Sequence, residues 1–235
     1  MARSIFLIPV IVLALCGATG KGERDPKNPT CPSKLNWSPY PAMRFTVTDV
    51  GGEHVLLAEG VVDNGLLPRL SQILKKDKGI TEIWLRSPGG VAVVGNEAGR
   101  MIRKYSPDIL TRIPKDWACA SACNFMFMGG KYRVVEPGGH FVVHMFTHIA
   151  DREAIKEDMR ADADDAVNMI GEIEQDSAML ASEDNDFLIR MGISRKLLTD
   201  VMYQQRSVAG AGKDQSTRRC MTNVENVKYN VTNAQ

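Results

Sequence analysis

Short apolar runs of strand length alternate with segments of helical periodicity along most of this chain, and this alternation restricts its fold more than any other feature. The runs of strand length cover 44–48, 55–62, 80–85, 109–113, 132–135 and 141–145, and the helical segments cover 66–74, 94–105 and 118–128. Because parallel strands must be joined by a crossover, usually a helix, this pattern predicts a parallel sheet with helices on its faces. No repeat and no dividing linker interrupts it, so residues 43–235 are predicted to form a single α/β domain.

An acidic segment over 151–190 departs from this alternation. Its apolar residues recur at helical spacing and form a stripe of Ile155, Met159, Val167, Ile170, Ile173, Met179 and Leu180. We therefore expect a long helix, which either covers one end of the sheet or projects as an arm that packs on another subunit. Beyond it, a short helix is expected at 197–203 and a loop at 206–219.

The charges of the chain are almost balanced. Its 235 residues include 29 basic and 28 acidic side chains, without a basic stripe, so a nucleic-acid partner is not expected. A hydrophobic content of 44% and a charged content of 24% are ordinary for a globular protein and argue against disorder.

The first twenty residues have the layout of a secretory signal peptide. A short cationic start is followed by an apolar run and a small-residue ending, which predicts cleavage before Lys21 and an irregular leader over 21–42. The apolar run is shorter than the roughly 20 residues that span a bilayer, which disfavours an uncleaved anchor. Lipidation at Cys16 is also disfavoured, because Leu15 is large where a small residue is normally required. The chain is therefore predicted to be exported to the periplasm.

Four cysteines remain after the predicted cleavage, and an oxidising compartment favours their pairing in disulfides. A zinc site is disfavoured because Cys119 and Cys123 lack nearby His or Cys ligands at the usual spacing. Three connectivities are open. A bridge between Cys31 and Cys220 would tie the two ends of the mature chain together, which leaves Cys119 to pair with Cys123. A four-residue spacing on a regular helix suits disulfide geometry poorly.

Two short segments carry residues that could stabilise an oxyanion. Ser87-Pro88-Gly89-Gly90 directly follows a predicted strand, and its glycines allow a bend that exposes backbone N–H groups, although such a sequence is more often a plain turn. Ser121 lies among small residues at 118–123, where a helix start would bring backbone N–H groups near its hydroxyl. The ordinary use of such a serine is as a helix cap.

A third segment supplies a candidate base. Residues 136–144 form a predicted turn and strand that contain both His140 and His144, whereas His54 and His148 are less well placed. Histidine is the usual base that activates a serine, because its pKa lies near neutral pH. A histidine at a strand end can equally serve packing.

The order and spacing of these three segments resemble the proteolytic subunit of the Clp protease, and more broadly the Clp/crotonase superfamily, most of all its exported periplasmic branch. The resemblance covers about residues 55–144 and continues more weakly to about residue 203. It implies a ClpP/crotonase-like fold of repeated β-β-α and βαβ units with a parallel sheet, plus the long acidic helix.

The resemblance also implies roles for single residues. Ser121 stands at the position of the family's nucleophile, and Gly90 and Ala122 stand where backbone N–H groups form the oxyanion hole. The family histidine lies seven residues after a proline, an offset that Pro137 and His144 keep, so the resemblance selects His144 over His140. The family's third catalytic residue, an acid, aligns near Gln205. Asp200 is the nearest carboxylate before that position and Asp214 the nearest after it, while a Ser-His dyad oriented by a polar residue or a backbone carbonyl is equally open.

These roles imply an exported serine hydrolase, with a peptide or protein as its substrate and no cofactor or metal. No P-loop is recognisable, so no ATPase domain is expected in this chain. The family usually forms rings through its long helix, which implies a homo-oligomer through 151–190. Two alternatives remain: a decayed member that acts as an exported binding or assembly module, and acyl-CoA chemistry, which an exported location disfavours.

Overall fold

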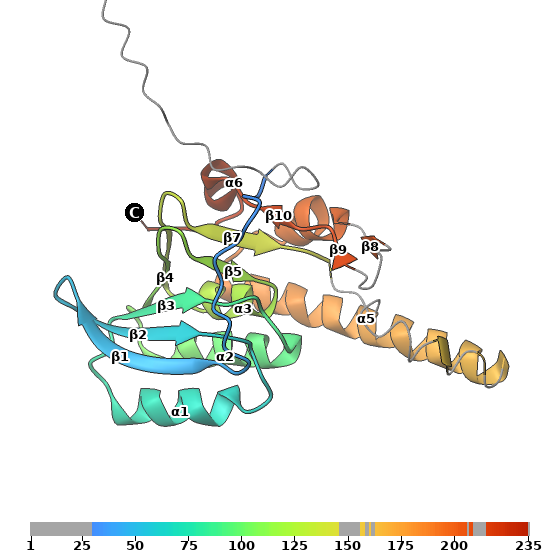
Figure 1. Cartoon of the computed structure of the whole chain (residues 1–235), viewed down its shortest axis with the longest axis horizontal. Helices are drawn as coiled ribbons and strands as arrows, with labels where there is room; N and C mark the ends of the chain where they lie inside the picture. The colour runs from blue at the N-terminus through green and yellow to red at the C-terminus, as the bar shows by residue number, and fades with distance from the viewer. Residues whose placement is uncertain are drawn as a thin grey trace, which may run out of the picture.

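The computed structural model describes residues 30–145, 156–157, 160, 163–205, 207–208 and 215–234 (Figure 1). The signal-peptide prediction for 1–20 and the alternative of a lipidated Cys16 fall outside these residues. Among the helices that are described, none combines the length and the apolar character needed to cross a membrane.

Five strands form the main sheet in the order β1-β2-β3-β4-β6. They are β1 (Arg44–Val50), β2 (Glu53–Glu59), β3 (Glu82–Arg86), β4 (Leu110–Ile113) and β6 (Tyr132–Val135). The first two are antiparallel across a two-glycine turn, and β2, β3, β4 and β6 are parallel, as the alternation predicted. Leu56, Ile83 and Thr111 lie side by side across the central strands, and all three are fully buried.

Three helices connect the parallel strands: α1 (Leu66–Lys76), α2 (Ala92–Tyr105) and α3 (Ala122–Met128). They pack in a row, α1 on α2 and α2 on α3. The contact between α2 and α3 depends on glycine, because a Cβ atom on Gly95 would lie 2.3 Å from the Ala122 carbonyl oxygen and one on Gly99 would lie 2.2 Å from that of Phe125. The two helix backbones are therefore closer than a side chain would allow.

A second, smaller sheet has the strand order β10-β7-β5 and contains β5 (Ala118–Ala120), β7 (His140–Val143) and β10 (Arg219–Cys220). The prediction of one helix over 118–128 is therefore wrong at its start. Residues 118–120 are extended because they pair with β7 on one side and bond to Ser87 on the other. Small residues without clear periodicity do not distinguish a buried strand from a helix.

The remaining described residues are mainly helical. It contains α5 (Ala163–Met191), the π-helix η2 (Leu197–Val201), the 3-10 helix η3 (Met202–Gln204), the short strands β8 (Ser207–Val208) and β9 (Gln215–Ser216), and α6 (Asn223–Lys228). The β8–β9 pair lies in the segment predicted to be a loop, and α6 was not predicted.

The long helix α5 joins the core only near its C-terminal end. Phe187 is fully buried there and packs edge-to-face on Phe125 of α3, with ring centroids 5.2 Å apart. Farther back, three residues of the predicted apolar stripe are exposed: Val167 at 68%, Ile170 at 47% and Met179 at 55%. The helix thus extends away from the sheets (Figure 1), and only its C-terminal end agrees with the interpretation of a helix that covers one end of the sheet.

Candidate active site

Ser121 occupies the bend between strand β5 and helix α3. Its backbone has φ 57° and ψ −126°, a combination that residues other than glycine seldom adopt. Its side chain makes no capping hydrogen bond to α3, so the helix-cap interpretation does not hold. The bend is fixed by backbone bonds: the Ser121 N–H donates to the Val142 carbonyl at 3.4 Å, and the Ser121 carbonyl accepts the Asn124 N–H at 2.8 Å.

The Ser87-Pro88-Gly89-Gly90 turn lies directly against this bend. A Cβ atom on Gly89, whose φ is 95°, would lie 2.5 Å from the Ser121 Cβ and 3.2 Å from the Ala122 backbone nitrogen. Only glycine therefore permits this approach. The buried Ser87 hydroxyl accepts the Gly89 N–H at 3.1 Å and holds the turn from within.

Two backbone N–H groups next to this bend, those of Gly90 and Ala122, have no partner in the adjoining strand bridge or helix. Gly90 forms a parallel bridge with Val62, in which the Gly89 carbonyl and the Val91 N–H make the two bonds, so the Gly90 N–H points away from Val62. Ala122 is the first residue of α3, where an N–H has no partner within the helix. N–H groups arranged in this way can receive a developing negative charge on oxygen.

The pairing of β5 with β7 determines which histidine lies near Ser121. These parallel strands are in register, with Ala118 opposite His140 and Ala120 opposite Val142. Ser121 and His144 therefore both follow the C-terminal ends of the pair, whereas His140 lies at the far end, about 13 Å back along the strand at roughly 3.3 Å per residue.

The imidazole of His144 is oriented by a backbone group. Its Nδ1 lies 2.9 Å from the Met145 carbonyl oxygen, which can only accept a hydrogen bond, so Nδ1 carries the proton and Nε2 has the free lone pair. Burial lowers the pKa of His144, the Met145 carbonyl raises it, and the positive charge of Arg218 lowers it. The guanidinium of Arg218 also lies 5.1 Å from the centre of the Trp37 ring. The His144 imidazole is therefore neutral near pH 7 and in the tautomer that a base requires.

Asp200, the candidate acid, does not reach His144 in the structure. It lies on the exposed side of η2, because Leu197, Leu198 and Val201 form the buried side, and its Oδ1 accepts a bond from the Thr199 hydroxyl at 3.1 Å. The alternative acid, Asp214, lies outside the described residues. The group that orients the His144 ring is the Met145 carbonyl. The sequence left open a backbone carbonyl in this role, but it could not identify which one, because every residue has a carbonyl.

Gln205, at the position where the resemblance places the acid, bonds elsewhere. Its Nε2 donates to the Val201 carbonyl at 3.1 Å, and its Oε1 accepts from the Thr217 hydroxyl at 3.1 Å.

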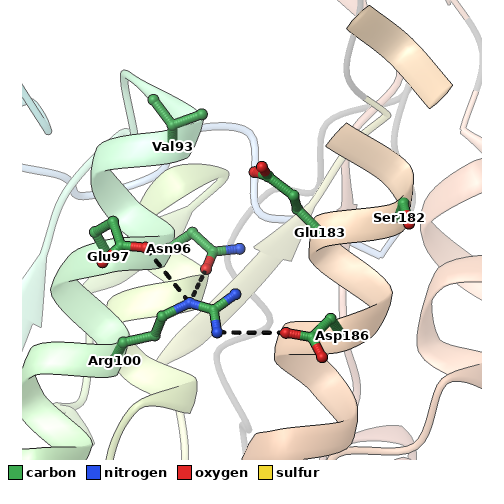
Figure 2. Close-up of a pocket in the computed structure, with 7 residues that line it drawn as sticks. All are labelled: Val93, Asn96, Glu97, Arg100, Ser182, Glu183 and Asp186. Atoms are coloured by element: carbon green, nitrogen blue, oxygen red, sulfur yellow. Dashed lines mark hydrogen bonds and ion pairs between the residues drawn. The ribbon is translucent and has the colours of Figure 1, made fainter. Parts of the chain in front are cut away.

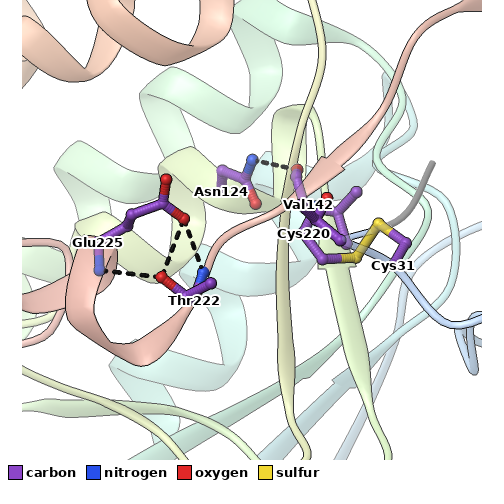
Figure 3. Close-up of a disulfide and its surroundings, with 7 residues drawn as sticks. Cys31, Asn124, Val142, Cys220, Thr222 and Glu225 are labelled. Carbon is purple, nitrogen blue, oxygen red and sulfur yellow. Dashed lines mark hydrogen bonds between the residues drawn. A yellow bond between two sulfur atoms is a disulfide. The ribbon is translucent and has the colours of Figure 1, made fainter. Parts of the chain in front are cut away.

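Asn124 is a further residue of this site. It is fully buried, and its Nδ2 donates to the Val142 carbonyl at 2.7 Å, as Figure 3 shows. The same carbonyl accepts the Ser121 N–H, so Asn124 connects the start of α3 to β7, the strand that His144 directly follows. A single buried asparagine has no sequence signal that separates this role from ordinary core packing.

Both predicted disulfides are present. Cys31 is bonded to Cys220 with Cα atoms 4.9 Å apart, and this bridge joins the leader to β10 (Figure 3). Cys119 is bonded to Cys123 with Cα atoms 5.4 Å apart. The second pair is compatible with a four-residue spacing because one cysteine is on a strand and the other on a helix, with the Ser121 bend between them.

A separate polar cavity of about 320 Å³ lies between α2 and α5 (Figure 2). The guanidinium of Arg100 crosses it and contacts Asn96 at 3.0 Å, Glu97 at 3.6 Å and Asp186 at 3.4 Å. None of the candidate catalytic residues lines this cavity. Within the described part of the chain, no cluster of three or more His, Cys, Asp or Glu side chains could hold a metal ion.

Comparison with known proteins supports the fold and leaves the activity open. No family model and no curated protein matches the sequence. Among solved structures, a mutant of ClpP1 from Listeria monocytogenes matches with a TM-score of 0.50 and 15% sequence identity, over 77% of this chain and 89% of that chain. The chain therefore has a ClpP-like fold, and this identity is too low to transfer a catalytic role.

Proposed function

We propose that this chain is an exported serine hydrolase of the peptidase type, with Ser121 as its nucleophile and His144 as its base. The observation that carries the proposal is the Ser121 bend, which holds a hydroxyl not used for capping and lies directly against Gly89 of the Ser87–Gly90 turn. The ClpP-like fold supports a peptide or protein as the substrate class.

The proposed reaction passes through an acyl-enzyme. The His144 Nε2 accepts the Ser121 hydroxyl proton while the Ser121 oxygen bonds to the substrate carbonyl carbon, whose oxygen becomes negative and is held by the Gly90 and Ala122 N–H groups. The imidazolium then donates its proton to the leaving amine as the carbon–nitrogen bond breaks. Water then gives a proton to the same Nε2 as its oxygen bonds to the ester carbon, and the imidazolium returns that proton to the Ser121 oxygen as the ester bond breaks.

The Met145 carbonyl replaces one function of a triad acid. It fixes the His144 tautomer, but it has no negative charge with which to stabilise the imidazolium. We therefore expect slower acylation than in an enzyme with a complete triad, where replacing the acid by its amide lowers the rate by about 10⁴-fold, largely through the wrong tautomer.

A fluorophosphonate probe tests the proposal, since it reacts only with an activated serine. Wild-type protein should be labelled, peptide mass spectrometry should place the adduct on Ser121, and Ser121→Ala should abolish it. His144→Ala should lower the labelling rate by at least about 10²-fold, whereas the matched variant His140→Ala should retain it, because His140 lies at the other end of β7. Absence of labelling in the folded, oxidised protein would refute the hydrolase and favour a binding or assembly module.

The pKa of His144 gives the proposal a pH signature. A base acts in its deprotonated form, and burial lowers the pKa of this group below 6.5. The labelling rate should therefore fall to half of its plateau at a pH below 6.5.

We also propose that the chain assembles with copies of itself through α5. Its exposed apolar residues Val167 and Ile170 support this role, since they are three residues apart on one face of a projecting helix and lack a cover within the described residues. Mass measurement in solution tests it. We expect the wild-type protein to be an oligomer and Ile170→Glu to dissociate it. A monomeric wild-type protein would refute the assembly.

A further inference from the structure

The disulfide between Cys119 and Cys123 encloses Ser121. We propose that this pair acts as a positioning device for the Ser121 hydroxyl, and that the site reaches full reactivity only when the pair is oxidised. This inference rests on the proposed hydrolase function, because it concerns the same nucleophile.

Cys119 belongs to the rigid side of the bend. It lies on β5, is opposite Phe141 in β7, and forms a parallel bridge with Ser87 on its other side. The bonds of that bridge are Ser87 N–H to the Ala118 carbonyl at 2.9 Å and Ala120 N–H to the Ser87 carbonyl at 3.0 Å. One sulfur is therefore fixed to the strand that leads into the Ser87–Gly90 turn.

Cys123 belongs to the helical side. It lies in the first turn of α3, directly after Ala122, whose backbone packs against Gly95 of α2. The chain must pass from the strand to this turn through Ser121, whose φ of 57° is sparsely populated by residues other than glycine. The hydrogen bond of the Ser121 N–H is long, at 3.4 Å, so the covalent link across the bend adds a restraint on the strand side, where that backbone bond is weak.

The two disulfides close loops of very different length, so they should affect local geometry and overall stability differently. A disulfide restricts the unfolded chain more as the loop it closes grows longer. This pair is separated by 4 residues in sequence, whereas Cys31 and Cys220 are separated by 189. The small ring therefore acts chiefly on local geometry, and the large one serves as a matched control. Both Cys119 and Cys123 are 0% exposed, which fits a structural link rather than a reactive thiol pair.

The test compares two double variants in the full oxidised protein: Cys119→Ala/Cys123→Ala and Cys31→Ala/Cys220→Ala. We expect the first to lower the fluorophosphonate labelling rate of Ser121 by about 10²-fold, the loss that a misplacement of about 1 Å produces. Its melting temperature should fall less than that of the second variant. The second should keep its labelling rate within about threefold at temperatures below its own transition. The pH midpoint of labelling should be equal in all three proteins, because the His144 environment is unchanged.

A second experiment reduces and reoxidises the disulfide in the wild-type protein, so it does not depend on the alanine substitutions. Wild-type protein is reduced until mass spectrometry shows that Cys119 and Cys123 are free thiols, labelled, and then reoxidised and labelled again. The rate should fall on reduction and recover on reoxidation, and Cys31→Ala/Cys220→Ala should behave in the same way. This experiment decides the question if the Cys119→Ala/Cys123→Ala variant fails to fold.

Different results would refute the positioning role of the disulfide and the hydrolase function. If Ser121 is labelled equally fast with and without the disulfide, the positioning role is overturned and the hydrolase stands. If oxidised wild-type protein is not labelled on Ser121 at all, both are overturned.

Discussion

Asp184 provides the most quantitative prediction that the structure allows. This carboxyl group lies on α5, is 7% exposed, and has a buried Oδ1 without a hydrogen-bond partner among the described residues. Burial raises its pKa from 3.8 to about 7, and the side chain of Asn96 on α2 opposes the shift in part. Between these two pH values the folded chain retains a proton that the unfolded chain has lost.

The sign and size follow from proton linkage. Because the folded state binds more protons at Asp184, the contribution of this group to stability is greatest below pH 3.8, falls as the pH rises and is constant again above about pH 7. A shift of about three pKa units at about 1.4 kcal/mol each gives a loss of about 4 kcal/mol. Asp184→Asn carries no charge at any pH. The difference in unfolding free energy between variant and wild type should therefore change by about 4 kcal/mol between pH 4 and pH 8, in favour of the variant at pH 8.

Urea unfolding followed by circular dichroism at intervals of one pH unit measures this difference, and contributions from other groups cancel in it. Asp186→Asn is the matched control two residues along the same helix. Hydrogen bonding to Arg190 lowers the pKa of Asp186, so this variant should be less stable than wild type at neutral pH, with a deficit that shrinks as the pH falls. A difference for Asp184→Asn that stays constant with pH would refute the reasoning.

Three further predictions concern other parts of the molecule. Hydrogen bonds to Asp49 and Asp77 raise the pKa of His54, so its contribution to stability is present below pH 6.5 and is lost as the pH rises through the raised pKa; an NMR titration of the imidazole should give a value above 6.5, and a value at or below it would contradict this. Gly95→Ala should destabilise the fold by about 1–3 kcal/mol in denaturant unfolding, because the new methyl group would meet the α3 backbone, and an unchanged midpoint would show that α2 can shift freely. Arg133→Met should cost about 2 kcal/mol or more in the same assay, because the buried Val231 carbonyl and the part-buried Asn230 carbonyl lose their donor, whereas a loss below 1 kcal/mol would show that water replaces it.

The fold was largely predictable because its signals are local. Alternating apolar runs identified the parallel strands of the main sheet, and leucines four residues apart identified α1. The strand over 118–120 was missed because its identity depends on Ser87 and β7, which are distant in sequence. Hydrophobic periodicity reports on the residues within one segment, whereas this strand forms because of the strands that pair with it.

Some parts of the candidate site could be predicted from the sequence, and others could not. Ser121 and the glycine turn could be proposed from residue types and spacing, and both lie at one end of the β5–β7 pair as the topology requires. The group that orients His144 could not be located, because it is a main-chain carbonyl and its position follows from how the chain leaves β7. The disulfide between Cys119 and Cys123 was expected to fit a helix poorly, and the bend at Ser121 removes that difficulty.

The bridge between Cys31 and Cys220 makes a closed covalent circuit of almost all the described chain. One backbone cut anywhere inside that circuit leaves two pieces that are still joined through sulfur. A nicked molecule therefore migrates as a single species on a gel until a reductant is added, and its two halves remain at high effective concentration for each other. The first proteolytic event then opens the chain without releasing a fragment, so a cut molecule can keep its packed core and re-form local contacts.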